Sequence, residues 1–400
     1  MYKLMKTLFV LILLFSAGFA GESLFGISDH SLGMIHNNYS GAGMARSYEV
    51  GSADSMQINY MNYALWTNFT YTAYSVKGGY KASFGDDGKE SDFFNTAANF
   101  ENAFMIVPII KKKLHVGAGV LPYTNIEQRL KTTDEDLLSQ EMLIRGGLSK
   151  ALFNISYKVL PGTGVGLGYE YNFGKINKEY RVQNEAEDIL PVRFDYDYRY
   201  YGHGIVGSVF YQPFNNLTLG ATYRPAVEMR VRIHPQTNSS TANKSQLHTI
   251  TLPSKLTAGA EVKIGARNYA GLDLIYQDWD KGYKLTDGNS DPHQTQYFKI
   301  GAGVERKQSP KMFTRLAERM DYRTGIFYST LNHKSLGNAV KEYGLSFGFS
   351  FPLQRFRSRI DFAGVIGKRG SLDKNQYEEV FINFGVSINA IETWFVNIED

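Results

Sequence analysis

The sequence contains no cysteine among its 400 residues. Disulfides, thiol-ligated metals and lipid attachment at a cysteine are therefore excluded. Its eight histidines are scattered without the spacing of metal ligands, and neither a His-Glu-x-x-His motif nor a local serine-hydrolase signature is present. We therefore expect no metal, no cofactor, no catalytic residue and no enzymatic activity.

An excess of one charge is also lacking. The formal net charge is +4, and it falls to +2 without Lys3 and Lys6 near the N-terminus. Such a nearly neutral chain does not indicate a nucleic-acid partner. After the first 20 residues, no apolar run approaches the roughly 20 residues that a membrane-spanning helix needs.

Aromatic residues and glycine are abundant instead. The chain has 27 tyrosines, 26 phenylalanines and 39 glycines, and its mean hydropathy is −0.29 although 43% of its residues are hydrophobic. This combination is typical of a membrane β-barrel, because only alternate residues of each strand face lipid.

The first 20 residues predict export. Lys3 and Lys6 form a positive region, Leu8–Phe15 is an unbroken apolar run, and Gly18 and Ala20 are small residues before Gly21. This is the pattern of a secretory signal peptide, and the run is too short to span a bilayer as a helix. We therefore assign residues 1–20 to a signal peptide that is removed before Gly21.

Strict alternation of apolar and polar residues predicts strands. It is clearest in Val380–Ile388, and it recurs in Tyr343–Phe351, Val165–Phe173 and Leu256–Ile264. A soluble sandwich also alternates, but its polar face should be rich in Lys, Glu, Thr and Ser. Here the polar face is largely glycine and the apolar face is large and aromatic, which favours a membrane barrel.

Fourteen segments follow this pattern, and an even number is what single-chain bacterial barrels have. The segments are Asn68–Phe84, Asn102–Ile110, Leu114–Leu130, Leu143–Val159, Thr163–Arg181, Val192–Tyr211, Leu217–Ile233, Leu247–Ile264, Asn268–Lys284, Thr295–Lys307, Tyr322–Leu331, Lys341–Phe351, Arg359–Gly367 and Tyr377–Phe395. The fold class expected from them is an all-β, transmembrane antiparallel β-barrel.

Short turns and longer polar connections alternate between these segments, as they do between the two ends of an outer-membrane barrel. The longer ones are expected to be loops: Gly85–Glu101, Thr124–Glu141, Val182–Pro191, His234–Gln246 and Asp278–Gln294. A long connection on the short-turn side contains Lys311–Arg319, which reads equally well as a short basic helix or as a plain loop.

Several motifs resemble those of the FadL-type family of outer-membrane hydrophobic-compound transporters, in particular members from Bacteroidetes-like bacteria. The residues that carry the resemblance are Ser40-Gly-Ala-Gly-Met-Ala45, Asn62-Tyr63-Ala64 in place of the family's Asn-Pro-Ala, Gly117-Ala-Gly-Val-Leu-Pro122, Tyr223-Arg-Pro-Ala-Val227, Asp278-Trp279 and Gly367-Lys-Arg-Gly370. Each motif is short, but their order and spacing cover nearly the whole chain after residue 20.

The resemblance implies that residues 21–67 form a hatch inside a barrel of residues 68–400. It also implies that the third strand bends inward at Gly117, Gly119 and Pro122 and opens a lateral gap for substrate. The residues support a bend independently, because proline lacks a hydrogen-bond donor and glycine has no side chain to pack. The alternative is that Pro122 simply ends the strand at the outer rim.

Other residues could face the substrate. Phe25 could reach a pocket, but a plain packing role is the favoured interpretation. Charges on the lumen side of the strands predict a balanced ion-pair network, or else a site for a fatty-acid carboxylate. These residues are Glu170, Arg224, Glu261, Lys263, Asp273, Lys299 and Arg323.

We therefore expect a monomeric barrel in the cell outer membrane that passes hydrophobic small molecules, such as long-chain fatty acids or aromatic hydrocarbons, without energy input. Its expected partners are the hydrophobic ligand, outer-membrane lipid or detergent, and the barrel assembly machinery. A general porin and a structural or adhesive barrel are the alternatives.

Overall fold

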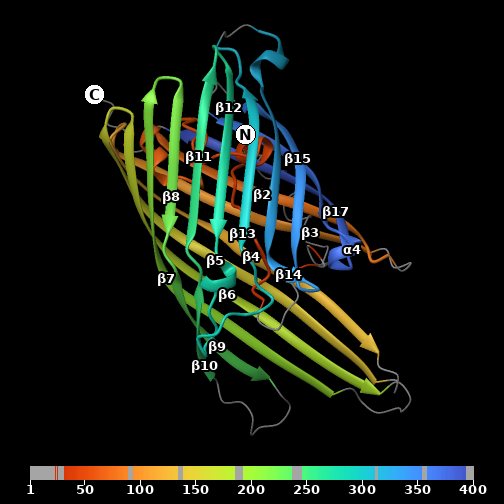
Figure 1. Ribbon diagram of the computed structural model, residues 1–400. Coiled ribbons are helices and arrows are strands. Elements are labelled where there is room, and N and C mark those ends of the chain that lie inside the picture. Colours follow the sequence, from red (N-terminus) through yellow and green to blue (C-terminus); the bar gives the residue numbers. More distant parts are fainter. Residues whose placement is uncertain are drawn as a thin grey trace, which may run out of the picture.

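The computed structural model describes residues 23, 25, 31–88, 93–133, 138–184, 192–236, 246–310, 314–353 and 358–392. The expected signal peptide, residues 1–20, and Gly21 lie outside the described residues. Neighbouring strands are antiparallel throughout, and the sheet closes on itself (Figure 1).

The wall contains strands β2 to β17. They are β2 (Thr72–Asp86), β3 (Phe93–Ile110), β4 (Leu114–Thr133), β5 (Leu138–Leu160), β6 (Thr163–Asn184), β7 (Val192–Phe214), β8 (Leu217–Arg224), β9 (Val227–Gln236), β10 (Gln246–Leu252), β11 (Lys255–Ile264), β12 (Asn268–Gln277), β13 (Tyr297–Arg306), β14 (Asp321–Ser335), β15 (Asn338–Leu353), β16 (Ser358–Gly370) and β17 (Glu378–Glu392). The other elements are β1 (Met34–Ile35), α2 (Gly41–Arg46), η1 (Tyr63–Asn68), α3 (Trp279–Gly282), η2 (Leu316–Arg319) and α4 (Leu372–Asn375).

The expected fourteen-stranded barrel is confirmed in the described part of the chain, because β8 with β9 and β10 with β11 are each two halves of one wall strand. Both interruptions contain a proline, Pro225 and Pro253, which cannot donate to the ladder. The two breaks lie side by side, since β8 pairs with β11 up to Arg224 opposite Lys255, and β9 pairs with β10 from Val227 opposite Leu252.

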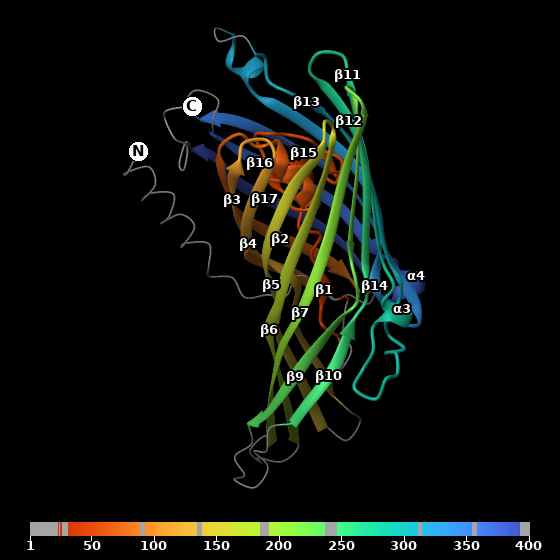
Figure 2. The same cartoon turned by 90° about the vertical axis from the view of Figure 1, so that its left-hand side faces the viewer.

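Two of the expected loops were wrong. The ranges Gly85–Glu101 and Thr124–Glu141 are mostly paired strand, because β3 already begins at Phe93 and β4 continues to Thr133. Strands β4, β5, β6, β7, β9 and β10 run well beyond the rest of the barrel (Figure 2). There the outward face of the strands carries charged residues such as Lys175 and Arg232, while the inward face carries buried apolar ones such as Val231. Backbone pairing therefore persists where the lipid-facing apolar pattern that predicts a membrane strand has ended.

The two faces of the wall differ as the alternation predicts. On β15 the outward Leu345 and Phe347 are 57% and 58% exposed, whereas the inward Ser346 between them is 1% exposed.

Among the described residues, no helix is long and apolar enough to cross a membrane. In the connection before β14, residues 316–319 form the helix η2, and residues 311–313 lie outside the described residues.

Candidate substrate cavity and wall gap

Residues 31–71, which we call the N-terminal segment, pack against the inward face of the wall. Helix α2 contacts β13 to β17, and η1 contacts β4 to β7. The approach is close enough to require glycine in the wall. A Cβ atom at Gly303 would lie 2.0 Å from the carbonyl oxygen of Arg46, and one at Gly348 would lie 2.6 Å from Cβ of Ala45. The glycine-rich polar face of the strands thus matches the backbone that lies on it.

Local hydrogen bonds shape this segment. Ser40 caps α2, because its hydroxyl accepts a hydrogen bond from the backbone N–H of Gly43 at 3.0 Å. The carboxylate of Glu49 then accepts from the backbone N–H groups of Ser40 at 2.7 Å and Tyr60 at 2.8 Å. The segment is therefore folded around one buried carboxylate.

Asn62, Tyr63 and Ala64, which resemble the hatch motif, begin η1. The side chain of Asn62 accepts from the backbone N–H of Ala64 and donates to the carbonyl oxygens of Val50 and, on the wall, Val209. The carbonyl oxygen of Tyr63 accepts from the hydroxyl of Ser156 at 2.7 Å. Asparagine thus ties the segment to the wall, and the ring of Tyr63 is buried in it.

Ion pairs also join the segment to the wall, as the prediction of a lumen network requires. The buried guanidinium of Arg46 pairs with Glu305 and, at 3.8 Å, with Glu261. The carboxylate of Asp273 accepts from the backbone N–H groups of Glu49 and Val50 at 2.6 and 3.0 Å.

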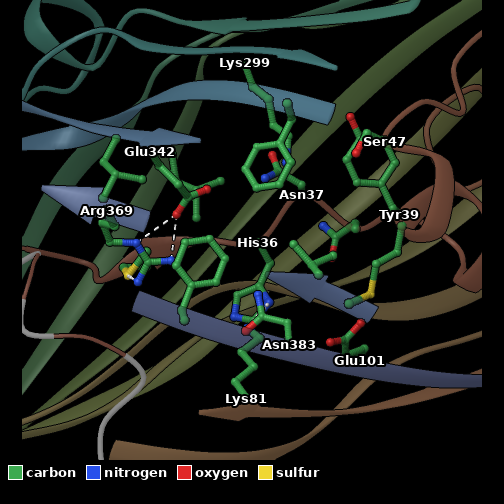
Figure 3. A pocket seen from close by; sticks show the side chains of 18 of the residues that line it. His36, Asn37, Tyr39, Ser47, Lys81, Glu101, Lys299, Glu342, Arg369 and Asn383 are labelled. Carbon is green, nitrogen blue, oxygen red and sulfur yellow. Dashed lines mark hydrogen bonds and ion pairs between the residues drawn. The ribbon is translucent and has the colours of Figure 1, made fainter. Parts of the chain in front are cut away.

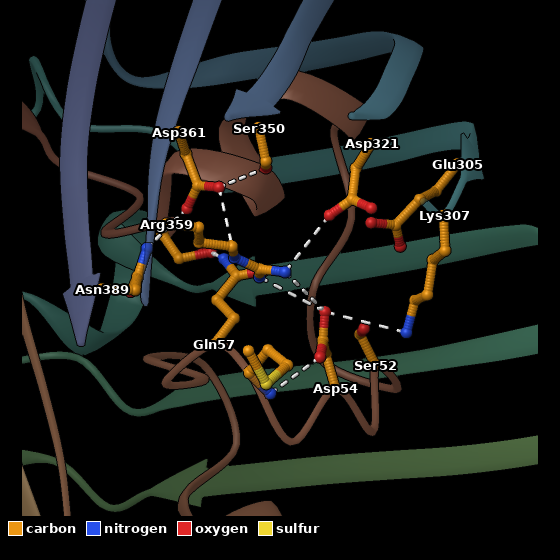
Figure 4. Close-up of polar contacts among 12 residues, drawn as sticks. Ser52, Asp54, Gln57, Glu305, Lys307, Asp321, Ser350, Arg359, Asp361 and Asn389 are labelled. Carbon is orange, nitrogen blue, oxygen red and sulfur yellow. Dashed lines mark hydrogen bonds and ion pairs between the residues drawn. The ribbon is translucent and has the colours of Figure 1, made fainter. Parts of the chain in front are cut away.

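A second cluster lies near the turn ends of the strands. Asp54 of the segment lies 3.3 Å from Arg359 and 3.7 Å from Lys307 of the wall (Figure 4). Of the other predicted lumen charges, Glu170 pairs with Lys150 at 2.7 Å and Arg323 pairs with Glu305 at 2.8 Å. Lys263 is exposed instead, because it lies at the end of β11 beside the turn.

The wall is incompletely paired between β3 and β4. Their pairing runs from Ile110 opposite Leu114 to Ala103 opposite Val120, and it ends there. Beyond this point β3 pairs only with β2, and β4 pairs only with β5 and with β1. We call the unpaired stretch the β3–β4 gap.

Pro122 lies two residues after Val120, the last residue of β4 that pairs with β3. It does not end the strand, since β4 continues to Thr133, but the β4–β5 register shifts between Pro122 and Thr124. Gly117 and Gly119 lie within the paired part. A Cβ atom at Gly117 would lie 2.5 Å from the Trp66 ring, and one at Gly119 would lie 2.3 Å from the Phe104 ring.

Strand β1 covers part of the gap from inside. Met34 and Ile35 pair with Asn125 and Thr124 of β4, and the backbone N–H of His36 donates to the carbonyl oxygen of Tyr123 at 3.0 Å. From Tyr123 to Asn125 the free edge of β4 is therefore paired with the N-terminal segment and not with the wall.

A cavity of about 140 Å³ lies beside this strand (Figure 3). Its lining includes Met34 and Ile35 of β1, together with Glu101 of β3. Glu101 is an extra residue in β3, because Lys77 pairs with Asn102 while Gly78 pairs with Phe100. The bulge directs its carboxylate to Lys77 at 2.5 Å.

The other charges of the cavity are also partnered. Arg369 lies 2.6 Å from Glu342, and the ammonium of Lys299 lies 4.2 Å from the centroid of the Phe327 ring. Sequence reasoning missed Lys77, Glu101 and the β1 strand. The consecutive polar residues Glu101 and Asn102 interrupt an apolar strand, which is the signal of a bulge.

Phe25 packs with Leu331 and Val340 in a separate buried cluster. It is not among the residues that line the cavity beside β1. Its role in a substrate pocket stays a prediction.

Buried Glu49 predicts a pH-dependent stability. Burial raises the pKa of Glu49 to about 7, although hydrogen bonds from the backbone N–H groups of Tyr60 and Ser40 lower this pKa in part. The folded state therefore holds this proton at pH values where the unfolded chain has lost it, so stability is full below about pH 4.5 and falls as the pH rises to 7. We expect thermal unfolding in detergent to report a loss of up to about 3 kcal/mol between pH 5 and 8 from this group. Glu49→Gln should remove that component, and an identical pH slope in the variant would contradict the assignment.

A side chain added at Gly117 is expected to disturb the packing against Trp66. Gly117→Val should displace Trp66 and lower stability by about 1–3 kcal/mol, as overpacking does. The matched control is Gly207→Val on β7, where no atom lies within 4 Å of an added Cβ. Equal thermal midpoints for the two variants would show that Trp66 does not press on this strand.

Comparisons with known proteins agree with this architecture. The family model described as BamG matches residues 3–399. The fold is similar to the crystal structure of a Pseudomonas aeruginosa FadL homologue (TM-score 0.64, 11% identity, covering 90% of this chain and 99% of that chain). It is also similar to the P. putida toluene transporter TodX (0.59, 12%, 88% and 98%) and the Ralstonia pickettii toluene transporter TbuX (0.57, 12%, 88% and 98%). No curated protein matches the chain.

Proposed function

The chain belongs to the BamG family and has the fold of the FadL-type channels, and from this premise we propose that it is an outer-membrane channel for the passive uptake of hydrophobic small molecules. In this proposal residues 21–67 are a hatch inside the barrel of residues 68–400. Substrate enters from the side of the long strands, binds in the cavity beside β1, and leaves sideways through the β3–β4 gap.

The observation that carries the proposal is the position of the cavity. One side of it is formed by Met34 and Ile35, which pair with the free edge of β4, and another by Glu101, just beyond the last β3–β4 pair. An unpaired backbone group in hydrocarbon costs several kcal/mol, so a membrane barrel tolerates a gap only where protein, water or a ligand covers it. Displacement of β1 would join the cavity to the gap.

The size of the cavity favours small substrates. A cavity of about 150 Å³ accepts a single aromatic ring such as benzene, and the cavity beside β1 measures about 140 Å³. Sites for larger ligands usually measure about 300–1,000 Å³. By volume alone, a one-ring hydrocarbon therefore fits the cavity as it stands, between the apolar Met34 and Ile35 and the partnered charges, whereas a long-chain fatty acid requires the N-terminal segment to move.

Uptake by cells that lack their own hydrophobic-compound channels tests the proposal. Radiolabelled toluene, a long-chain fatty acid and a small sugar are compared, with the full chain and with a deletion of residues 21–67. We expect saturable toluene uptake without sugar passage by the full chain, and sugar leakage by the deletion. Sugar passage through the full chain would favour a general porin, and passage of no solute would favour a structural or adhesive barrel.

A second candidate substrate class is an amphiphile with a carboxylate. Arg224 is 2% exposed, and its Nε and Nη1 atoms have no hydrogen-bond partner among the described residues. Arg224 lines a second, smaller cavity together with Lys150 and Lys255. Among the residues that line it, one carries a carboxylate, Glu170. Competition of toluene uptake by the fatty acid, but not by its methyl ester, would favour this class.

A further inference from the structure

The outward face of β6, β7 and β9 carries a line of cations where these strands run beyond the rest of the barrel (Figures 1 and 2). Lys175 pairs in register with Arg199, and Arg199 pairs with Arg232. We call these three residues the cation row. All three are exposed, while their strand neighbours Ile176, Tyr200 and Val231 are buried on the inward face.

This arrangement is unfavourable in isolation. Like charges directly opposite each other on neighbouring strands repel, and the row places three cations on adjacent strands. Asp197 offsets part of the charge, because it lies 2.8 Å from Lys175 and also interacts with Arg199. Arg230, two residues before Arg232, adds a further exposed cation, and Glu228 adds one exposed carboxylate.

Charges farther out on the same face are paired. Arg181 lies 2.5 Å from Glu179, and Arg193 lies 3.0 Å from Asp195. In the described part of the chain, by contrast, no carboxylate forms an ion pair with Arg199, Arg230 or Arg232. The excess positive charge thus lies in the cation row and at Arg230 beside it, nearer the barrel wall than the paired charges.

Aromatic rings border the row on the side of the wall. Phe173 precedes Lys175 by two residues on the same face of β6, and its ring stacks on that of Tyr171 at 5.7 Å. Tyr171 also contacts the ring of His203 on β7 at 5.3 Å. Aromatic girdles mark the interface between a membrane and water. Two strand residues span about 7 Å, so the row lies at the height of the lipid headgroups.

We infer that the cation row is a binding site for phosphate-bearing headgroups of net negative charge in outer-leaflet lipid. Lysine and arginine clusters at a membrane surface attract anionic headgroups, and guanidinium groups bind phosphate oxygens with charge-assisted hydrogen bonds. A phosphate between Arg199 and Arg232 would also relieve their mutual repulsion. The inference rests on the proposed membrane location but not on transport.

Lipid binding to the purified full chain in detergent tests this inference. Native mass spectrometry counts bound lipid during titration with diphosphorylated lipid A, with phosphatidylethanolamine and with inorganic phosphate. The test variant is Arg199→Gln with Arg232→Gln. The matched control is Arg181→Gln with Arg193→Gln, which removes two cations from the same face.

We expect lipid A to bind the native chain and the control variant, and its affinity to fall at least tenfold in the test variant. Phosphatidylethanolamine and inorganic phosphate should bind no chain at comparable concentrations. Equal lipid A affinity in the test and control variants, or equal binding of inorganic phosphate, would overturn the inference. Toluene uptake should be unchanged in the test variant, so a failure of the transport proposal leaves the binding result intact.

Discussion

Arg46→Ala is expected to lower the stability of the folded chain by about 3–5 kcal/mol and to let small sugars leak through the barrel. Removing one partner of a buried ion pair usually costs this much, because a buried charge loses its compensation. Glu305 keeps Arg323 at 2.8 Å, so we expect a loss near the lower end of this range. Arg46 is 1% exposed and joins α2 to Glu305 and Glu261 of the wall. The variant therefore loosens the N-terminal segment that fills the lumen.

Thermal unfolding in detergent and swelling of sugar-loaded liposomes measure the two effects. The matched control is Arg193→Ala, which removes an exposed arginine that pairs with Asp195 outside the wall. Exposed ion pairs contribute little, so the control should leave both readouts unchanged. A tight, stable Arg46→Ala barrel would show that this ion pair does not hold the segment in place.

A disulfide between β1 and β4 is expected to abolish hydrophobic uptake. Met34 and Asn125 are register partners, and such partners have Cα atoms about 4.5–5.5 Å apart, within the range of a disulfide. The chain has no cysteine of its own, so Met34→Cys with Asn125→Cys introduces one defined cross-link. Under oxidising conditions β1 cannot leave the β4 edge, and toluene uptake should fall at least tenfold and return on reduction.

The control disulfide joins two strands that the account requires to stay together. Ala103→Cys with Val120→Cys cross-links the last β3–β4 pair, and uptake should be the same before and after reduction. Native uptake by the oxidised Met34–Asn125 variant would refute the displacement of β1 as the step that opens the exit.

The strand pattern predicted the fold because lipid enforces it. Each outward position from Val165 to Phe173 must be apolar, so hydrophobicity alternates wherever a strand crosses the membrane. Beyond the membrane the constraint ends, and the paired part of β4 after Thr124 was therefore read as a loop. The proline breaks at Pro225 and Pro253 were missed because the apolar alternation resumes on either side of them.

The candidate site was only partly predictable. Pro122 lies near the end of the β3–β4 pairing, and its missing donor is a local property that the sequence displays. Its role in a substrate path stays a prediction. The pairing of Met34 with Asn125 joins residues 91 positions apart in the chain, and no local pattern encodes it. The same holds for the cavity, whose lining comes from the N-terminal segment and from several separate strands.

Photoaffinity labelling tests the central claim most directly. A toluene analogue that carries a diazirine is bound to the full chain in detergent, irradiated, and located by peptide mass spectrometry. The account predicts label on Met34, Ile35 and the β3 residues around Glu101, with loss of this label when unlabelled toluene competes. Label that is confined to the outward face of the barrel, or that toluene does not displace, would contradict a hydrophobic path from the cavity to the β3–β4 gap.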